Sequence, residues 1–360
     1  MSTETRRQRV AEIVQTARSK RARMRDERIT MAHGAGGRSS QALIEGLVLP
    51  ALGNDRLAQL ADAGALAVGD AALAVTTDSF VVRPLRFPGG SIGELAVNGT
   101  VNDLAVCGAR ALALTLSMVL EEGLTTEALR AEVEAVARTA AQAHVEVIAG
   151  DTKVVEHGHA DGMYLCTTGI GQVDPRAALS PDGLRAGDRV LVSGPVGAHG
   201  MAIMLARGEF ELQAPIASDT ASLWPAARAL LDAAGGDVHC MRDATRGGVA
   251  SALNELARAS GVAVLLREAD VPVEPAVAAA AELLGIDPLY VASEGRLVAF
   301  VAPGCAQEAL AALRAVPGCG HAADVGEVRD EPPGMVLVDT AFGGERVLDL
   351  LAGDPLPRIC

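Results

Sequence analysis

The sequence has few aromatic residues, no closely spaced cysteine pair and no long apolar run, and each absence excludes a class of protein. Aromatic residues make up 2% of the 360 residues, too few for the stacking surfaces that bind single-stranded nucleic acid. None of the six cysteines stands in a C-x-x-C pair, which argues against a zinc ribbon, a thioredoxin motif or a disulfide framework. No uncharged apolar run approaches the ~18 residues of a membrane span. The N-terminal segment has no apolar stretch typical of a secretory signal, so we expect a cytoplasmic protein.

An excess of positive charge is also missing. The formal net charge is −14, which disfavours nucleic acid and anionic membranes as partners, because both require a concentrated positive surface. Hydrophobic residues make up 49% and charged residues 21% of the chain, a composition typical of a folded protein. The length predicts two domains, since a domain typically spans ~100–200 residues.

Lysine is nearly absent. Of the 31 basic residues only Lys20 and Lys153 are lysines, and the rest are arginine. Arginine cannot replace a compact ammonium group whose pKa moves with its surroundings. Lys153, in an apolar segment next to glycine, is therefore a candidate for chemistry. The alternative is that Lys153 is an ordinary surface residue that has remained lysine by chance.

The chain divides into four parts. Residues 1–28 are rich in arginine and predict a solvated extension, with a basic docking arm as the alternative. Residues 29–175 alternate strand and helix patterns and predict an N-terminal α+β domain. Residues 176–345 follow a turn-rich boundary and predict a second α+β domain. Residues 346–360 contain two prolines and predict a flexible, extended tail, because proline fixes φ and removes a backbone donor.

Hydrophobic periodicity predicts the elements of both domains. Ser91 and Glu94 predict a capping box at the start of a helix over 91–108. The segment 145–151 predicts a strand that ends in a turn at Asp151. The other strands are expected at 72–82, 111–120, 163–171, 189–195, 262–266 and 297–302, with a closing strand at 334–341. The other helices are expected at 39–48, 125–144, 197–207, 219–234, 247–259 and 304–315.

Several familiar motifs are absent or incomplete. There is no phosphate-binding G-x-x-x-x-G-K-[ST] sequence, and HGAGG (33–37) lacks the third glycine of the dinucleotide fingerprint. Ser91 stands in a G-x-S-x-G sequence, but no strand directly precedes it, as a nucleophile elbow requires. His157 and His159 form an H-x-H pair, for which a polar loop is favoured over a metal site.

Five aspartates recur at predicted strand or helix ends among small residues. Carboxylates placed in this way form an open, oxygen-rich pocket, which suits Mg²⁺ together with a nucleotide phosphate. Each aspartate alone is weak evidence for such a site, because aspartate is common in turns. Together, with Lys153 two residues after the fourth, they predict a magnesium–nucleotide site. They are Asp70, Asp78, Asp103, Asp151 and Asp243.

Two glycine-rich turns precede predicted helices. HGAGGR (33–38) offers backbone N–H groups and Arg38, which can wrap a phosphate at a helix N-terminus. TRGG (245–248) is a second such turn and contains Arg246. A flexible loop is the alternative in each case. Glu294, in a glycine-flanked turn before a strand, is a candidate base.

Together these motifs carry a family resemblance. HGAGGR, GDAALAVTTDSFVV, NGTVNDLAVCGA, AGDTKVV, RDATRGGVA, SEGRL and the terminal PRIC make the chain similar to the HypE family of hydrogenase maturation factors. That family belongs to the superfamily of aminoimidazole ribonucleotide synthetase and selenophosphate synthetase. The first six motifs indicate the superfamily, and PRIC indicates HypE. The similarity runs from about residue 30 to residue 360, so residues 1–28 lie outside it.

The resemblance implies a fold and a reaction. Such proteins are homodimers of a two-domain α+β fold related to aminoimidazole ribonucleotide synthetase, and their N-terminal domains form a β-barrel at the dimer interface. The carbamoyltransferase HypF places a carbamoyl group on the C-terminal cysteine thiol. ATP then drives dehydration of the thiocarboxamide to a thiocyanate. The cyano group passes to iron on the HypC–HypD scaffold complex and becomes a cyanide ligand of [NiFe]-hydrogenase.

On this basis each candidate residue receives a role. The catalytic candidates are Cys360, Lys153 and Glu294. The candidates for ATP binding are Gly34, Gly36, Gly37, Arg38, Thr77, Asp78, Asn102, Thr152 and Asp243. The candidates for Mg²⁺ are Asp70, Asp103 and Asp151, with Asp78 and Asp243 ranked behind them.

The chemistry of the residues agrees with these roles. An amide oxygen leaves poorly, whereas its phosphorylation makes phosphate the leaving group, and a base must then remove two N–H protons. A thiol that visits several enzymes needs a movable arm, and Gly353, Pro355 and Pro357 provide a hinge and keep that arm extended.

Two alternative functions remain open. A selenophosphate synthetase or other small-molecule kinase is disfavoured, because the N-terminal glycine loop holds neither cysteine nor lysine. The other alternative is a silent carrier, in which ATP is only a structural ligand.

Overall fold

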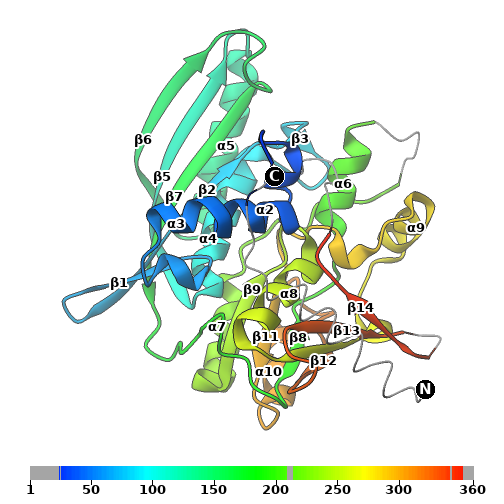
Figure 1. Cartoon of the computed structure of the whole chain (residues 1–360). Coiled ribbons are helices and arrows are strands. Elements are labelled where there is room, and N and C mark those ends of the chain that lie inside the picture. Colours follow the sequence, from blue (N-terminus) through cyan, green and yellow to red (C-terminus); the bar gives the residue numbers. More distant parts are fainter. Residues whose placement is uncertain (1–23, 25, 209–213, 341–342, 352–360) are drawn as a thin grey trace.

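The computed structural model describes residues 24, 26–208, 214–340 and 343–351. Two sheets organise the chain (Figure 1). The N-terminal sheet has the strand order β1-β2-β7-β5-β6, and the C-terminal sheet has the order β14-β13-β10-β12-β8-β11-β9. Helices are interspersed with these strands, so the α+β prediction is confirmed. No helix in the described part of the chain has the length and apolar character needed to cross a membrane.

The N-terminal sheet has one covered and one open face. Helices α4 and α5 cover it, and Val101, Leu104 and Leu114 are buried between α4 and the strands. On the other face the alternate residues of β2 are exposed, and nearly all of β6 is exposed. The strands are β1 (Gly64–Val68), β2 (Ala71–Phe80), β5 (Ala109–Glu121), β6 (Glu146–Val155) and β7 (Met163–Val173), and the helices are α4 (Ile92–Val106) and α5 (Thr126–Gln142).

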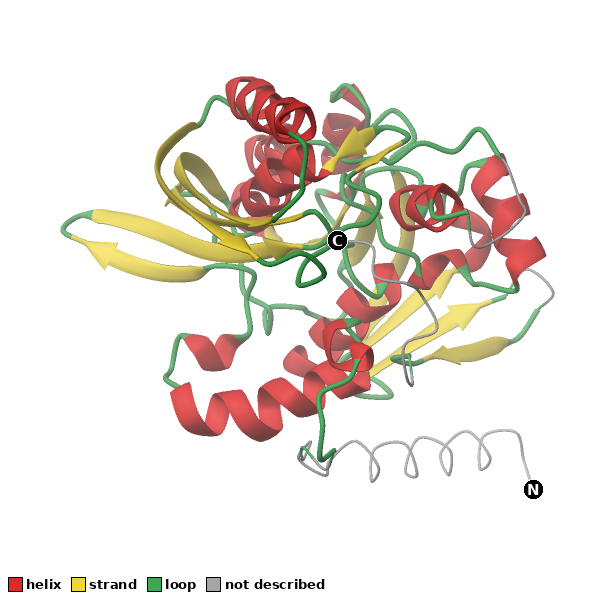
Figure 2. Ribbon diagram, turned by 90° about the horizontal axis from the view of Figure 1, so that it is seen from above, coloured by secondary structure: helices red, strands yellow, loops and turns green. Residues whose placement is uncertain are grey.

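The segment before this sheet carries the first glycine-rich turn. Its elements are η1 (Met31–Gly34), α2 (Arg38–Leu43), η2 (Ile44–Val48), α3 (Leu49–Leu52) and η3 (Leu57–Gln59). The helix expected over 39–48 therefore starts near its predicted residue, but its second half is a π-helical turn. The β1–β2 hairpin projects from the body of the molecule (Figure 2).

Helices pack on both faces of the C-terminal sheet. Val264, Phe300 and Leu253 belong to the core between the sheet and α8, and Leu191 and Leu230 to the core between the sheet and α7 with α10. The strands are β8 (Arg189–Val192), β9 (Val238–Asp243), β10 (Ala263–Arg267), β11 (Leu297–Val301), β12 (Ala323–Arg329), β13 (Met335–Asp339) and β14 (Glu345–Leu348). The helices are α6 (Ala198–Ala206), α7 (Trp224–Ala234), α8 (Gly248–Ser260), α9 (Pro275–Leu284) and α10 (Ala306–Ala315), with the short 3-10 helix η6 (Pro288–Tyr290). A separate two-stranded sheet, β3 (Arg86–Phe87) and β4 (Gly90–Ser91), lies just before α4 in the chain.

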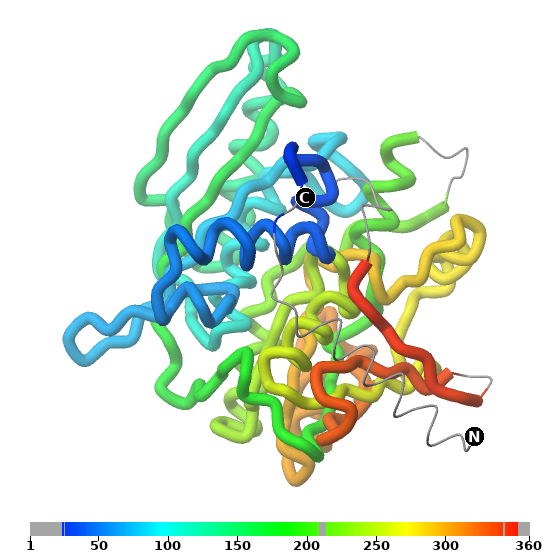
Figure 3. Tube along the Cα trace, in the orientation of Figure 1, coloured from blue at the N-terminus to red at the C-terminus, as the bar shows by residue number. Residues whose placement is uncertain are grey.

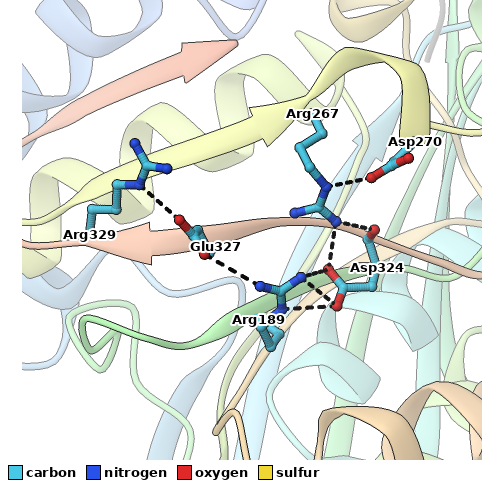
Figure 4. A network of polar contacts seen from close by, with 6 residues as sticks. All are labelled: Arg189, Arg267, Asp270, Asp324, Glu327 and Arg329. Atoms are coloured by element: carbon cyan, nitrogen blue, oxygen red, sulfur yellow. Dashed lines mark hydrogen bonds and ion pairs between the residues drawn. The ribbon is translucent and has the colours of Figure 1, made fainter. Parts of the chain in front are cut away.

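Ion pairs connect three adjacent strands of this sheet (Figure 4). Strand β12 lies between β8 and β10, and its Asp324 accepts hydrogen bonds from Arg189 at 2.9 Å and from Arg267 at 3.1 Å. Glu327 likewise contacts Arg189 at 3.4 Å and Arg329 at 2.9 Å. The acids of the middle strand thus separate arginines that would otherwise repel one another.

Three predictions about elements are wrong. Ser91 does precede α4, but its Oγ has no hydrogen-bond partner, because the Glu132 carboxylate of α5 accepts from the Gly93 N–H at 3.1 Å in its place. The strand at 145–151 does not end at Asp151 but continues as β6 to Val155. The closing strand is β14 rather than the one at 334–341, so the first residues of the predicted tail belong to the sheet.

Gly150 explains the error in β6. The predicted end at Asp151 places this glycine next to a turn, yet it pairs with Leu116 of β5. A Cβ atom at this position would lie 2.4 Å from the Leu116 carbonyl oxygen. The glycine therefore permits close approach of two strands, and Asp151 and Lys153 lie within a strand.

Candidate active site

Five carboxylates surround a pocket of about 240 Å³ between the two sheets. Asp78 and Asp103 come from β2 and α4, Asp62 from the turn before β1, Asp243 from the end of β9, and Glu294 from the turn before β11. The other lining residues are Thr76, Thr77, Gly99, Thr245 and Arg246. Residues distant in sequence thus form one acidic cavity.

Three of these carboxylates form a compact group. One oxygen atom each of Asp62, Asp103 and Asp243 lies within 4.8 Å of the others. Asp103 accepts a hydrogen bond of 2.7 Å from Thr76, and Asp62 forms an ion pair with Arg242. Burial and then the charges of neighbouring aspartates raise the pKa of Asp103 and of Asp243. Such a set of hard oxygen ligands fits Mg²⁺, whose charge relieves their mutual repulsion.

Glu294 faces the same pocket. Burial, followed by the charges of Asp243, Asp78 and Asp219, raises its pKa to about 8. Its backbone is fixed, because its N–H donates to Asp219 at 3.0 Å and its carbonyl accepts from Asn102 at 3.0 Å. A carboxyl with a pKa near neutrality is suited to proton transfer.

Arg246 is the only cation among the described residues that line this acidic pocket. Its charge lowers the pKa of Asp78 and of Glu294 against the larger effect of burial. Its guanidinium donates to the Gly34 carbonyl at 3.2 Å. The arginine therefore connects the acidic pocket to the glycine-rich turn.

The two glycine-rich turns interlock around a neighbouring pocket of about 280 Å³, which shares Asp62, Asp243, Thr245 and Arg246 with the first. Gly36 has φ +76, and a Cβ atom there would lie 2.7 Å from the Arg246 carbonyl oxygen. Its own carbonyl accepts from Ser251 of α8 at 3.0 Å. Only glycine fits this crossing.

The end of the described chain lies against the first glycine-rich turn. Arg38 does not line either pocket. Its guanidinium contacts the Asp349 carboxylate at 2.5 Å, and its backbone N–H donates to the Leu351 carbonyl at 3.3 Å. Figure 3 shows this red end running from β14 towards the dark blue segment. Cys360 lies outside the described residues, nine positions beyond Leu351, a separation that spans at most roughly 30–32 Å.

The structure brings together some of the predicted site residues. Gly34 and Gly36 line the second pocket, Thr77, Asp78, Asp103 and Glu294 line the first, and Asp243 lines both. Gly37 is the N-cap of α2 beside them.

Other predicted residues lie apart from the pockets within one chain. Asp70 is exposed in the turn of the β1–β2 hairpin. Asp151, Thr152 and Lys153 lie on the exposed edge strand β6, which β7 and β5 separate from β2. Lys153 contacts Asp151 at 2.7 Å. Asn102 is buried, and its amide binds backbone groups, as described for Glu294.

Asp62 is the functional candidate that sequence reasoning missed. It lies before β1 and is followed by alanine and glycine, the same small-residue setting that singled out the other aspartates. That signal was sufficient to find it.

Comparison with known proteins gives a consistent result. Family profiles for AIR synthase related proteins match both halves of the chain, the N-terminal domain over residues 60–173 and the C-terminal domain over residues 185–339. A carbamoyl dehydratase HypE from Bradyrhizobium diazoefficiens is 48% identical over 92% of this chain and 96% of its own length.

Solved structures extend the similarity to three dimensions. A HypE–HypF complex is similar with 41% identity and a TM-score of 0.82, covering 86% of this chain and 100% of the other. The hydrogenase maturation protein HypE in complex with ATP has 42% identity and a TM-score of 0.77, covering 91% and 98%. The two-domain fold is therefore shared along nearly the whole chain.

Proposed function

The chain belongs to the HypE family of carbamoyl dehydratases, and we propose that it uses ATP to dehydrate a carbamoyl group carried on the Cys360 thiol. The product is a thiocyanate that supplies cyanide to the iron of [NiFe]-hydrogenase. The observation that carries the proposal is the pocket in which five carboxylates and Arg246 converge. Arg246 connects this pocket to the first glycine-rich turn, and Arg38, after that turn, contacts Asp349 at the root of the C-terminal tail.

The reaction has two steps with balanced chemistry. The thiocarboxamide oxygen attacks the γ-phosphorus of ATP, ADP leaves, and one N–H proton is lost. The C–O bond then breaks with loss of the second N–H proton, which gives a C≡N bond and inorganic phosphate. Glu294 is our proton acceptor, because a pKa of about 8 leaves a fraction of this carboxyl ionised near neutral pH and gives that fraction a high proton affinity.

The polar residues divide the remaining work. Asp62, Asp103 and Asp243 would hold Mg²⁺, which supplies charge neutralisation at the transferring phosphoryl group when bound. Arg246 orients phosphate oxygens between the two pockets. The N–H of Gly37, at the N-terminus of α2, would add a donor without charge, whereas the Gly36 N–H donates to Ser40 at 2.9 Å.

A homodimer would give Lys153 and Asp151 a role. Exposed apolar side chains on the N-terminal sheet, among them Leu66, Val75 and Leu112, form a surface that a second copy would cover as a shared β-barrel. Because β6 lies at the far edge of this sheet, we place Lys153, Asp151 and Thr152 of one copy at the pocket of the other.

Subunit mixing tests this arrangement. A Lys153→Arg chain and a Glu294→Gln chain, each slowed when alone, should regain activity together, because one site of the mixed dimer then has both natural residues. Lack of activity in a verified heterodimer would contradict the arrangement.

Its partners follow from the reaction. We propose the carbamoyltransferase HypF as carbamoyl donor, the HypC–HypD iron scaffold as cyanide acceptor, and the cytoplasm, where ATP is available, as the location. A relative has been solved as a HypE–HypF complex, which supports the first partner.

Mass spectrometry tests the function. Incubation with carbamoyl phosphate, the carbamoyltransferase and ATP with Mg²⁺ should first add one carbamoyl group to Cys360, and the adduct should then lose one water. Persistence of the carbamoyl adduct with ATP present would contradict the proposal and favour a silent carrier.

A further inference from the structure

The root of the C-terminal tail is held by hydrogen bonds to the backbone carbonyls of Leu348, Asp349 and Leu351. The Asn254 amide donates to the Leu348 carbonyl at 2.9 Å. The Tyr290 hydroxyl donates to the Asp349 carbonyl at 2.7 Å. Arg38 contacts the Asp349 carboxylate at 2.5 Å and donates its N–H to the Leu351 carbonyl. Three residues from separate elements thus hold the chain at the end of β14 and just after it.

None of the three donors lines the second pocket, but each belongs to an element that borders it. Asn254 lies on α8, the helix that lines this pocket with Ser251. Arg38 directly follows the first glycine-rich turn. Tyr290 ends η6, which packs on Gly248, where a Cβ atom would lie 2.8 Å from the Tyr290 carbonyl carbon. The elements that shape the pocket therefore also hold the tail.

We propose that Asn254, Tyr290 and the Arg38–Asp349 pair form a tail anchor that fixes the starting point of the arm bearing Cys360 at the pocket rim. This inference rests on the proposed function, because it concerns delivery of the carbamoylated thiol. Asn254 and Tyr290 are positioning residues, since they contact Leu348 and Asp349, eleven or more residues before Cys360. The anchor raises the effective concentration of the cargo at the pocket, as a short tether does.

Tyr290→Phe is the sharpest perturbation, because it removes one hydroxyl and keeps the ring. A neutral hydrogen bond has a modest net effect, so the first-order rate of water loss should fall about 2- to 10-fold. Carbamoylation by the transferase and the KM for ATP should stay unchanged. Tyr164→Phe is the matched control, because it removes the hydroxyl of the other tyrosine, which lies 3.4 Å from Asp161.

A longer tail separates anchoring from a merely structural effect. Nine glycine and serine residues inserted after Leu351 double the arm, and effective concentration falls roughly as the −3/2 power of length, a loss of about 3-fold. With Tyr290→Phe the same insertion should cost less, because the arm then already starts further back.

The outcomes are distinct when the full chain is used and adduct formation and water loss are followed separately. Water loss at the wild-type rate in Tyr290→Phe, or equal effects of the insertion in both backgrounds, would overturn the anchor. Failure of the wild-type adduct to lose water would overturn the proposed function and, with it, the role of the anchor.

Discussion

Glu294→Gln should stabilise the protein free of nucleotide and divalent cation while abolishing its chemistry. In the folded protein the pKa of this carboxyl is raised from 4.5 to about 8, so near neutral pH the folded state keeps a proton that the unfolded chain releases. Stability therefore falls as pH rises above 4.5, by about 1.4 kcal/mol per pH unit, until pH approaches 8. At pH 7 the carboxyl costs about 3 kcal/mol, a cost that glutamine does not carry.

Urea unfolding in the presence of a chelator, followed by circular dichroism at pH 7 and at pH 4.5, measures this difference. The variant should be more stable by about 3 kcal/mol at pH 7 and by less than about 0.5 kcal/mol at pH 4.5, where the folded state binds the proton and the unfolded chain holds it about half of the time. Glu134→Gln, an exposed change on α5, should alter stability by less than about 0.5 kcal/mol. The dehydration rate of Glu294→Gln should fall by about 10²- to 10⁴-fold. Equal stability differences at the two pH values would refute the account of a buried, protonated carboxyl.

Four further predictions concern the proposed reaction. Cys360→Ala should leave ATP binding intact and abolish the carbamoyl adduct in mass spectrometry. An adduct on another residue would show that Cys360 does not carry the carbamoyl group. Lys153→Arg should slow water loss by at least about 10-fold although the charge is kept, and normal turnover would show that the lysine is incidental. Asp103→Asn should raise the Mg²⁺ concentration for half-maximal activity by about 10-fold or more, and an unchanged titration would place the metal elsewhere. Deletion of residues 1–28 should leave dehydration in vitro unchanged, and loss of activity would make this segment part of the working fold.

Local sequence patterns were sufficient to predict most helices and strands. They failed where contacts with distant parts of the chain determine how an element begins or ends. The amphipathic pattern of α5 and the alternation of β2 each report which side of the element is buried, so both were predicted close to their observed bounds. The capping of α4 depends on a glutamate from another helix, which no local pattern contains. Gly150 has the same appearance in sequence whether it turns the chain or admits a neighbouring strand.

The site shows the same division. Asp78, Asp103, Asp243 and Glu294 were predicted as polar groups at element ends, and they do meet in one pocket. That Asp70 points to the hairpin tip instead depends on the length of β1 and β2, which the aspartate motif does not encode. The dimer placement of Lys153 stays a prediction, because it depends on a second chain.

Asn102 has a consequence for how cargo reaches the pocket. From α4 its side chain binds three backbone groups of the other half of the molecule, the carbonyls of Ala221 and Glu294 and the N–H of Leu223. A hinge motion that separates the halves would break all three hydrogen bonds. The buried amide of Asn102 would then lack hydrogen-bond partners, which is energetically costly. Access by a large opening between the two halves is therefore disfavoured. The C-terminal tail would instead carry its cargo into a pocket whose two sides keep their relative positions.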